Sequence, residues 1–244
     1  MQIVKSQIKP ISEIDGEKAL LTIQRIAKTC YRSYKDTDDV ESAKRIIRSL
    51  IASGHHSLLE NYIISMNYIS NIAAYKDLTR SRVGFSYAIE STRWCNYSKG
   101  KYTNQIRFLD PVEIPNNQSK TYYLWVSAME KAEEYYMLMA KQGAKPDELS
   151  LVLPQSTAAE FNITGNLRAW RSLFDLRVLD KTGHARDCIH EILDPTLELF
   201  HEKIPVVFDD QYELLQQKRI EKKYKEVQKL QLTIPFEEQK VNKR

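Results

Sequence analysis

Segments with the apolar spacing of helices occupy most of this chain, and they do not alternate regularly with strands. We expect long helices in seven segments: 17–30, 40–53, 71–82, 119–141, 166–178, 184–201 and 212–230. A further short helix is expected between Pro146 and Pro154. Strand-like segments separate some of them, at 62–69, 105–109 and 158–164. A doubly wound parallel sheet requires a βαβ rhythm, which this order lacks. The pattern therefore predicts an α+β fold, a helix-rich single domain with a small, mainly antiparallel sheet.

Length and composition restrict the class of protein. The chain has 244 residues, which suits a main domain at 1–210 followed by a charged helix and tail at 211–244. Its formal net charge of +4 favours anionic ligands without identifying nucleic acid as a partner. The three cysteines form no Cys-x-x-Cys pair, so neither a disulfide framework nor a zinc knuckle is indicated. Since no apolar run is long enough to span a membrane, we expect a soluble cytoplasmic protein.

Residues 80–94 concentrate charge and hydroxyl groups in a short segment. The arginines Arg80, Arg82 and Arg93 each present a planar fork of donors that suits phosphate or carboxylate oxygens. Arg80 and Arg82 are two positions apart, so on a helix they point in different directions and would contact different groups or subunits. The alternative is an ion-paired surface, but the polar and aromatic residues that follow favour a site for an anionic ligand.

A second polar block, residues 54–61, lies just after a helix stop at Gly54. It contains adjacent histidines, followed by Ser57 and Glu60. Such a turn can present polar groups to a ligand. Adjacent histidines with no other histidine or cysteine nearby do not indicate a metal site. The alternative is structural, with Ser57 as the N-cap of a helix and Glu60 completing a capping box.

A third block, residues 165–177, has polar residues at both ends of an apolar helical stripe. Asn166, Trp170, Leu173 and Arg177 share one face of the expected helix. Arg168 and Ser172 share another face. The face with Asn166 and Arg177 could border a ligand, or its terminal polar side chains could simply reach solvent.

Together the three blocks resemble the signature of the flavin-dependent thymidylate synthases. That family has Arg-His-Arg and then Ser-x-Arg-Tyr, where this chain has Arg80-Ser81-Arg82 and Ser91-Thr92-Arg93-Trp94. It also has Gly-His-x-Ser/Thr-x-x-Glu-His and Asn-x-Arg-x8-Leu-Arg, which residues 54–61 and 166–177 resemble in the same order. The resemblance covers about residues 10–205. The chain departs from the signature at Asn61, Asp77, Ser81, Ser150 and an extra residue between Arg82 and Ser91.

The resemblance implies roles for individual residues. Flavin contacts would come from ten positions: His55, Ser57, Glu60, Arg80, Ser81, Arg82, Asn166, Arg168, Ser172 and His184. Nucleotide contacts would come from five: Glu90, Ser91, Thr92, Arg93 and Arg177. Among these, Ser91 and Arg177 are the expected catalytic residues, with Arg177 stabilising negative charge on the uracil ring. The resemblance implies no metal ligand.

The implied reaction is the reductive methylation of dUMP to dTMP. FAD would be the cofactor, with NADPH and methylenetetrahydrofolate as co-substrates, and residues 1–210 would form the flavin- and nucleotide-binding domain. The resemblance also implies a homotetramer with sites built between subunits. From the composition and the lack of long apolar runs we expect no membrane partner and no nucleic-acid partner.

Two alternatives remain open from the sequence. The departures at Asp77, Ser81 and Ser150, with the extra residue before Ser91, motivate the alternative of a relative that transfers another one-carbon unit, such as hydroxymethyl, or acts on another pyrimidine nucleotide. The basic segment 216–230 would suit a non-catalytic module that binds nucleotides or RNA, although a solvated helix with i,i+4 ion pairs explains the same residues.

Overall fold

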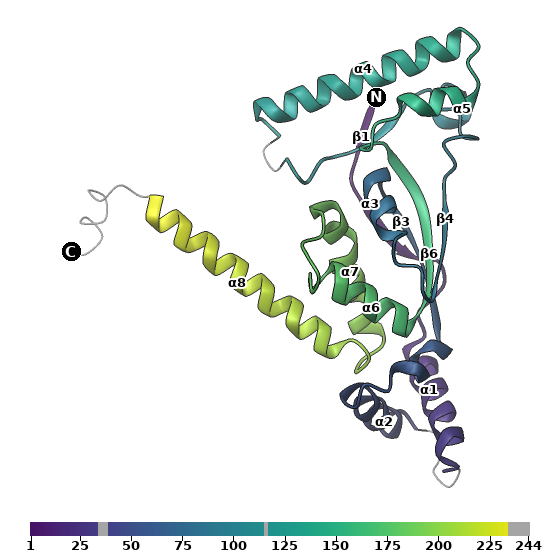
Figure 1. The fold of residues 1–244 in the computed structure, drawn as a ribbon, viewed down its shortest axis with the longest axis vertical. Coiled ribbons are helices and arrows are strands. Elements are labelled where there is room, and N and C mark those ends of the chain that lie inside the picture. The colour runs from purple at the N-terminus through teal and green to yellow at the C-terminus, as the bar shows by residue number, and fades with distance from the viewer. Residues whose placement is uncertain (34–38, 115–116, 234–244) are drawn as a thin grey trace, which may run out of the picture.

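The computed structural model describes residues 1–33, 39–114 and 117–233 (Figure 1). The strands are β1 (Gln2–Val4), β2 (Gln7–Pro10), β3 (Ile63–Asn71), β4 (Phe85–Ile89), β5 (Arg107–Leu109) and β6 (Ala158–Asn166). The α-helices are α1 (Gly16–Tyr31), α2 (Val40–Ala52), α3 (Ile72–Leu78), α4 (Lys120–Lys141), α5 (Pro146–Leu149), α6 (Leu167–Arg177), α7 (Asp187–Lys203) and α8 (Asp209–Thr233). Three 3₁₀ helices complete the elements: η1 (His56–Asn61), η2 (Gly100–Tyr102) and η3 (Ser150–Val152).

The main sheet has four antiparallel strands in the order β2-β3-β6-β4. Apolar residues alternate along β3, where Ile64, Met66 and Tyr68 are buried. The residues between them pair with polar partners on β6: Ser65 Oγ lies 2.8 Å from Thr164 Oγ1. The remaining strands, β1 and β5, form a parallel pair. The predicted α+β fold with a small, mainly antiparallel sheet is therefore confirmed.

The main core lies between the sheet and the helices on one side of it (Figure 1). Trp170 and Phe174 of α6 contact Phe200 of α7, with the Trp170 ring edge-on to Phe200 at 5.1 Å. Trp170 also meets Phe85 of β4 edge-on, at 5.2 Å. Burying such aromatic side chains is among the largest favourable contributions in a core. They attach α6 firmly to the sheet, and α6 carries part of the third sequence block.

A second, smaller core lies under α4, at the top of Figure 1. Its buried members include Phe108 of β5, Tyr136 of α4 and Leu149 of α5. The Tyr136 hydroxyl accepts a hydrogen bond from the Tyr97 backbone N–H at 3.1 Å. The segment after β4, which carries the end of the first sequence block, is thereby held against α4.

Helix α8 leaves the rest of the fold and is attached mainly by its first turns (Figure 1). The buried Arg171 of α6 donates to both carboxylate oxygens of Asp210, at 2.8 and 2.7 Å. Leu215 is buried against the main core, whereas Ile220 and Tyr224 are exposed. Most of the predicted polar tail, residues 234–244, lies outside the described residues. None of the helices in the described ranges has the length and apolar character that a membrane span requires.

Several predicted elements differ from the structure near the candidate site. The helix expected at 71–82 ends at Leu78, because the chain turns there and the Tyr87 hydroxyl donates to the carbonyl oxygens of Leu78 and Ser81. The alternative interpretation of Ser57 as an N-cap is wrong: η1 begins at His56, and none of the described side chains caps it. Strands β1, β2 and β4 were not predicted from the sequence.

Candidate functional site

The three sequence blocks meet at one end of the main sheet. Ile63, the first residue of β3, pairs with Asn166, and Phe85, the first residue of β4, pairs with Gly165. The backbone N–H of Asn166 donates to the Gly84 carbonyl oxygen at 3.3 Å. The end of the 54–61 block, the turn after Arg82 and the start of α6 are therefore neighbours, although the first and last are about a hundred residues apart in sequence.

Gly84 allows the turn after Arg82 to lie close against the start of α6. Its φ is +78°, and a Cβ built there would lie 2.8 Å from Ala169 Cβ and 2.9 Å from Asn166 Nδ2. Asn166 is the N-cap of α6, where its side-chain oxygen accepts from the Ala169 N–H at 2.8 Å. The predicted flavin contact Asn166 therefore also has a structural role, and it fixes the N-terminus of α6 beside the 82–84 turn.

The 54–61 block contacts α6 through an ion pair. Arg168 Nη1 lies 2.6 Å from Glu60 Oε1, and both side chains are about half exposed. Ser57 is exposed on η1. His55 is also exposed and borders a cavity of about 400 Å³ between α1 and α2. The structure thus places Glu60 and Arg168 together, with Ser57 in the same short helix as Glu60.

Asp77 lies at the centre of a second cluster, formed by three arginines. Its carboxylate oxygens lie 3.4 Å from Arg80 Nη2 and 2.9 Å from Arg186 Nε. Its carbonyl oxygen accepts from Arg177 Nη2 at 3.3 Å. One carboxylate cannot neutralise three guanidinium groups, so the cluster keeps positive charge that suits an anionic ligand.

Tyr87 connects the Asp77 cluster to β4. Burial raises the pKa of its hydroxyl to about 12, the neighbouring Tyr75 adds to this effect, and Arg82 and Arg177 oppose it. Tyr87 therefore stays protonated at neutral pH and donates to the Leu78 and Ser81 carbonyl oxygens. The predicted flavin residue Ser81 is held here through its backbone, while the Arg82 side chain is exposed.

The predicted nucleotide residues lie beyond the other end of β4. Ser91 and Thr92 are half-buried in a turn in which the Ser91 carbonyl oxygen accepts from the Cys95 N–H at 2.9 Å. The exposed Arg93 pairs with Asp147, with 2.6 Å between Nε and Oδ1. The five-residue strand β4, about 13 Å long, separates this turn from Arg82. Within one chain, the structure therefore does not bring the Ser91 turn together with the flavin residues at the start of β4.

Glu90 borders a cavity of about 590 Å³. Its carboxylate accepts from the Tyr97 hydroxyl at 3.0 Å and lies 3.3 Å from Arg107 Nη2. Burial and the nearby Glu90 carboxylate raise the pKa of Tyr97 above its usual range, so this phenol remains a donor. Lys101 and Asn162 line the same cavity. Its polar, mixed-charge wall could hold a small ligand with hydrogen-bonding groups.

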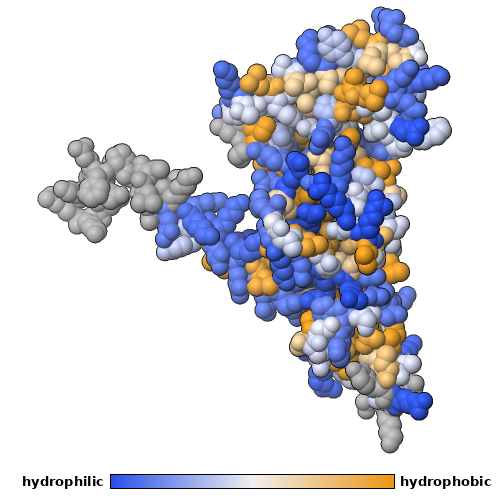
Figure 2. Space-filling view, viewed as in Figure 1, coloured by the Kyte–Doolittle hydropathy of each residue, from blue (hydrophilic) through white to orange (hydrophobic). Residues whose placement is uncertain are grey.

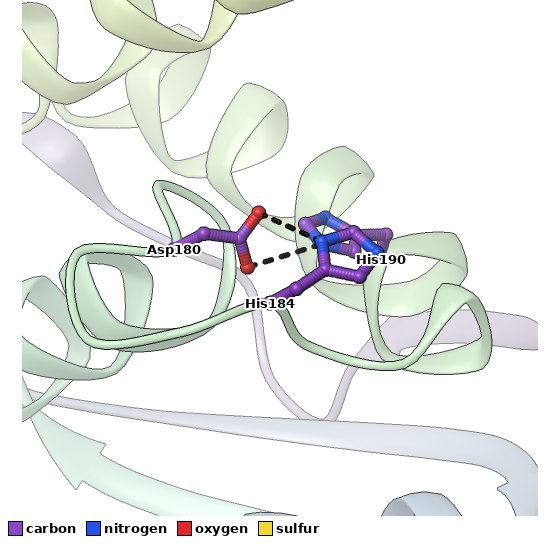
Figure 3. A group of neighbouring side chains, drawn as sticks. All are labelled: Asp180, His184 and His190. Atoms are coloured by element: carbon purple, nitrogen blue, oxygen red, sulfur yellow. Dashed lines mark hydrogen bonds and ion pairs between the residues drawn. The ribbon is translucent and has the colours of Figure 1, made fainter.

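Two predicted flavin residues lie apart from the Asn166 end of the sheet. Ser172 is exposed along α6. His184 is exposed between α6 and α7. Its ring stacks on His190, with 5.7 Å between the ring centres, and its Nδ1 lies 3.4 Å from Asp180 Oδ2 (Figure 3).

The sequence analysis missed several residues of these clusters. Arg186 joins the Asp77 cluster, and Tyr97 and Arg107 hold Glu90. Arg186 is only two positions after His184, so the sequence could have indicated it as a further cationic residue near a predicted site residue. Tyr97 and Arg107 offered no comparable signal, because only the fold brings them to Glu90.

The family model of the thymidylate synthase complementing protein matches residues 14–206 of the chain. The chain belongs to this family. The expectation of membership in this enzyme family is therefore confirmed, and the matched span agrees closely with the extent of the resemblance in the sequence.

Individual relatives are distant but cover most of the chain. The chain is 27% identical over 216 residues to a flavin-dependent thymidylate synthase from Mycobacterium avium, covering 82% of this chain and 81% of the relative. It is 25% identical over 206 residues to one from Corynebacterium diphtheriae, covering 77% of each chain. The fold is similar to that of a UMP/dUMP methylase, PolB from Streptomyces cacaoi, solved with 5-Br dUMP. The TM-score is 0.68 at 20% identity, with 86% of this chain and 96% of the other covered.

Proposed function

We propose that the protein methylates dUMP at carbon 5 of the uracil ring to form dTMP, using FAD, NADPH and methylenetetrahydrofolate. The observation that carries this proposal is the meeting of the three family blocks at one end of the sheet. Arg82 comes from the first block, Glu60 from the second and Asn166 from the third, and β3, β4 and α6 bring these segments together there. Family membership supports the same reaction, and the names of the relatives support a flavin as the cofactor.

The residues present suit a flavin dinucleotide. Its two phosphates need cationic donors, and the exposed Arg80, Arg82 and Arg168 supply them from adjacent segments. The buried Arg177 Nε has no hydrogen-bond partner among the described residues. A buried donor without a partner is costly, so this group favours a bound ligand with an acceptor oxygen beside α6.

When bound, the reduced flavin supplies the hydride for this chemistry. Arg177 would orient the uracil ring and stabilise negative charge that develops on its carbonyl oxygen. Ser91 would provide a hydroxyl contact to the nucleotide, and Arg93 would exchange its exposed partner Asp147 for the phosphate. Tyr87 would keep the Arg82 turn in position through its bonds to Leu78 and Ser81.

Cys188 does not suit the role of nucleophile. It is buried, and burial together with a hydrogen bond to Glu113 raises the pKa of its thiol to about 12. Almost none of it is thiolate at neutral pH, and the thiolate is the reactive form. This environment supports a reaction in which Cys188 does not attack the pyrimidine ring.

We also propose a homotetramer with shared sites. The Ser91 turn and the flavin residues lie at opposite ends of β4, so a second copy would have to complete each site. Helix α4 offers a surface for such contact, because Tyr123, Leu124 and Tyr135 are each more than half exposed. Figure 2 shows apolar side chains on the surface over α4.

The test combines flavin binding with product analysis. The purified protein is titrated with FAD, then supplied with NADPH, methylenetetrahydrofolate and one nucleotide at a time: dUMP, UMP or dCMP. We expect a flavin-bound protein that converts dUMP to dTMP, identified by mass spectrometry. Arg177→Lys should lower turnover strongly, because the single ammonium cannot reproduce the guanidinium fork. Arg48→Lys, an exposed change on α2, should not.

Each other outcome has a definite meaning. A colourless protein that takes up no FAD would contradict the flavin site. A hydroxymethylated product, or a product from dCMP alone, would replace the proposed reaction with the divergent one. Salt-sensitive RNA binding without flavin uptake, unaffected by Arg82→Met or Arg177→Lys, would instead support a non-catalytic binding module.

A further inference from the structure

Three metal-ligating side chains converge between α6 and α7. Asp180 and His184 lie on the connecting loop, and His190 lies in the first turns of α7 (Figure 3). Asp180 Oδ2 is 3.4 Å from His184 Nδ1, and Asp180 Oδ1 is 3.5 Å from His190 Nε2. Ligand atoms from all three residues lie within 4.8 Å of one another.

These separations suit a tetrahedral divalent ion. Zinc binds nitrogen and oxygen ligands at about 2.0–2.1 Å, so two ligands of a tetrahedral site lie about 3.3 Å apart. The separation of Asp180 Oδ2 from His184 Nδ1, 3.4 Å, is close to that value, and His190 Nε2 lies 3.5 Å from the other oxygen of the same carboxylate. The separation between the two histidine nitrogens needs to shorten by at most about 1.5 Å. The His184 side chain is 74% exposed, so it is free to rotate by that amount.

His190 has the surroundings of an oriented ligand. Its Nδ1 lies 3.0 Å from Asp194 Oδ1, which fixes the ring and leaves Nε2 directed at Asp180. That Nε2 is buried and has no hydrogen-bond partner among the described residues. A carboxylate that holds the remote nitrogen of a ligating histidine is a regular feature of zinc sites. A bound ion would satisfy the buried nitrogen.

Lys218 of α8 competes for the same carboxylate. Its Nζ lies 3.0 Å from Asp180 Oδ2, while Asp180 Oδ1 accepts from the Ala185 N–H at 2.8 Å. The alternative interpretation is therefore that these residues form an ion-paired cluster that binds no metal. The two interpretations differ in what removal of the lysine does, because Lys218 supports the ion pairs but repels a dication.

We propose that Asp180, His184 and His190 form a binding site for one divalent transition-metal ion, zinc in particular. The fourth position is open to water or to Asp187, whose Oδ1 lies 3.9 Å from His184 Nε2. The ion would join the 178–186 loop to α7. Arg177 and Arg186 flank this loop, so its position matters to the Asp77 cluster. The metal proposal does not rest on the proposed function, and the two share only His184.

The test uses the full-length protein, stripped with chelator and free of flavin. Zinc affinity is measured by competition with a chromophoric chelator, and Co²⁺ is added as a spectroscopic probe. We expect one ion per chain and the intense visible bands of four-coordinate Co²⁺. His190→Asn and His184→Asn should remove this binding. Asp194→Asn should weaken it about 10–100-fold, because the histidine loses its orienting partner. Lys218→Met should tighten it.

His201→Asn is the matched control. His201 also pairs with a carboxylate, with 2.9 Å between its Nδ1 and Asp209 Oδ1, but it belongs to no such three-residue group among the described residues. Its substitution should leave zinc affinity unchanged. Absence of zinc and cobalt binding by the wild type would overturn the proposal, as would equal affinities for the His190, His184 and His201 variants. His184 is exposed, so its variant keeps the test decisive if His190→Asn fails to fold.

Discussion

Gly84→Ala tests the close approach on which the candidate flavin site depends. The φ of Gly84 is +78°, a left-handed backbone conformation that costs any L-residue about 1–2 kcal/mol, so alanine destabilises the fold by this amount. Its Cβ would also lie under 3 Å from Ala169 Cβ and Asn166 Nδ2. Crowding of this kind and distortion of the Asn166 cap cost about 1 kcal/mol each. We therefore expect the free energy of unfolding to fall by about 3–4 kcal/mol.

Gly143→Ala separates strain from crowding. Gly143 has φ at +87°, but no described atom lies within 4 Å of a Cβ built there. The free energy of unfolding of Gly143→Ala should therefore fall only by the cost of the backbone strain, about 1–2 kcal/mol. Urea unfolding, followed by circular dichroism on flavin-free protein at one fixed concentration, gives both values. FAD titration of the same variants should show weaker binding for Gly84→Ala and unchanged binding for Gly143→Ala.

Two results would refute this reasoning. If the two alanine variants lost equal stability, the approach of Gly84 to α6 would not be as close as the structure has it. If Gly84→Ala were destabilised as expected but bound FAD like the wild type, the flavin would not lie at this end of the sheet.

Three further predictions concern stability and binding. Asp210→Asn removes the charged partner of the buried Arg171 and should cost about 1–2 kcal/mol at pH 7, after allowance for the half-exposed carboxylate. Burial alone would raise the pKa of Asp210, but its interactions with Arg171 lower this pKa overall. The stabilisation is therefore present above about pH 4 and is lost as the pH falls through the lowered pKa. An equal cost of Asp210→Asn in urea unfolding at pH 7 and at pH 3 would contradict this prediction. Tyr97→Phe should cost about 1 kcal/mol in the same assay, because Glu90 loses a buried donor, and no loss would show that Arg107 alone suffices. Arg168→Met should leave the free energy of unfolding nearly unchanged, because its pair with Glu60 is exposed, yet should weaken FAD binding; the reverse pattern would assign Arg168 to stability alone.

Long, strongly periodic helices were predictable from the sequence. The segment expected at 40–53 is α2, and the segment expected at 119–141 is α4, each within one residue at either end. Their apolar stripes and polar N-caps are local signals, and Asp39 and Ser119 do cap these helices. The prediction of a helix at 71–82 was wrong in its last turn. The chain there is held by hydrogen bonds from the Tyr87 hydroxyl to Leu78 and Ser81, and these bonds depend on the position of β4.

Part of the candidate site was also predictable from the sequence. The order of the three blocks led to the family, because signatures of ligand-contacting residues keep their type and spacing along the chain. The same signature named Arg80 and Arg177, which the structure places together at Asp77. The roles of Arg107 and Tyr97 could not be predicted from the sequence. Both residues contact the Glu90 carboxylate, and only the folded arrangement around β4 and β5 brings them to it.

Residue order alone therefore determined the helical content, the mixed fold class and the family, because periodicity, caps and motif spacing are local properties of the chain. Only the tertiary structure decided which charges are neighbours. It joined Asp77 to Arg186 and Asp180 to His190 and Lys218, and it separated the Ser91 turn from Arg82 by the length of β4. The physical reason is that electrostatic and hydrogen-bonding interactions depend on distances of a few ångströms, and packing of the sheet and helices sets those distances.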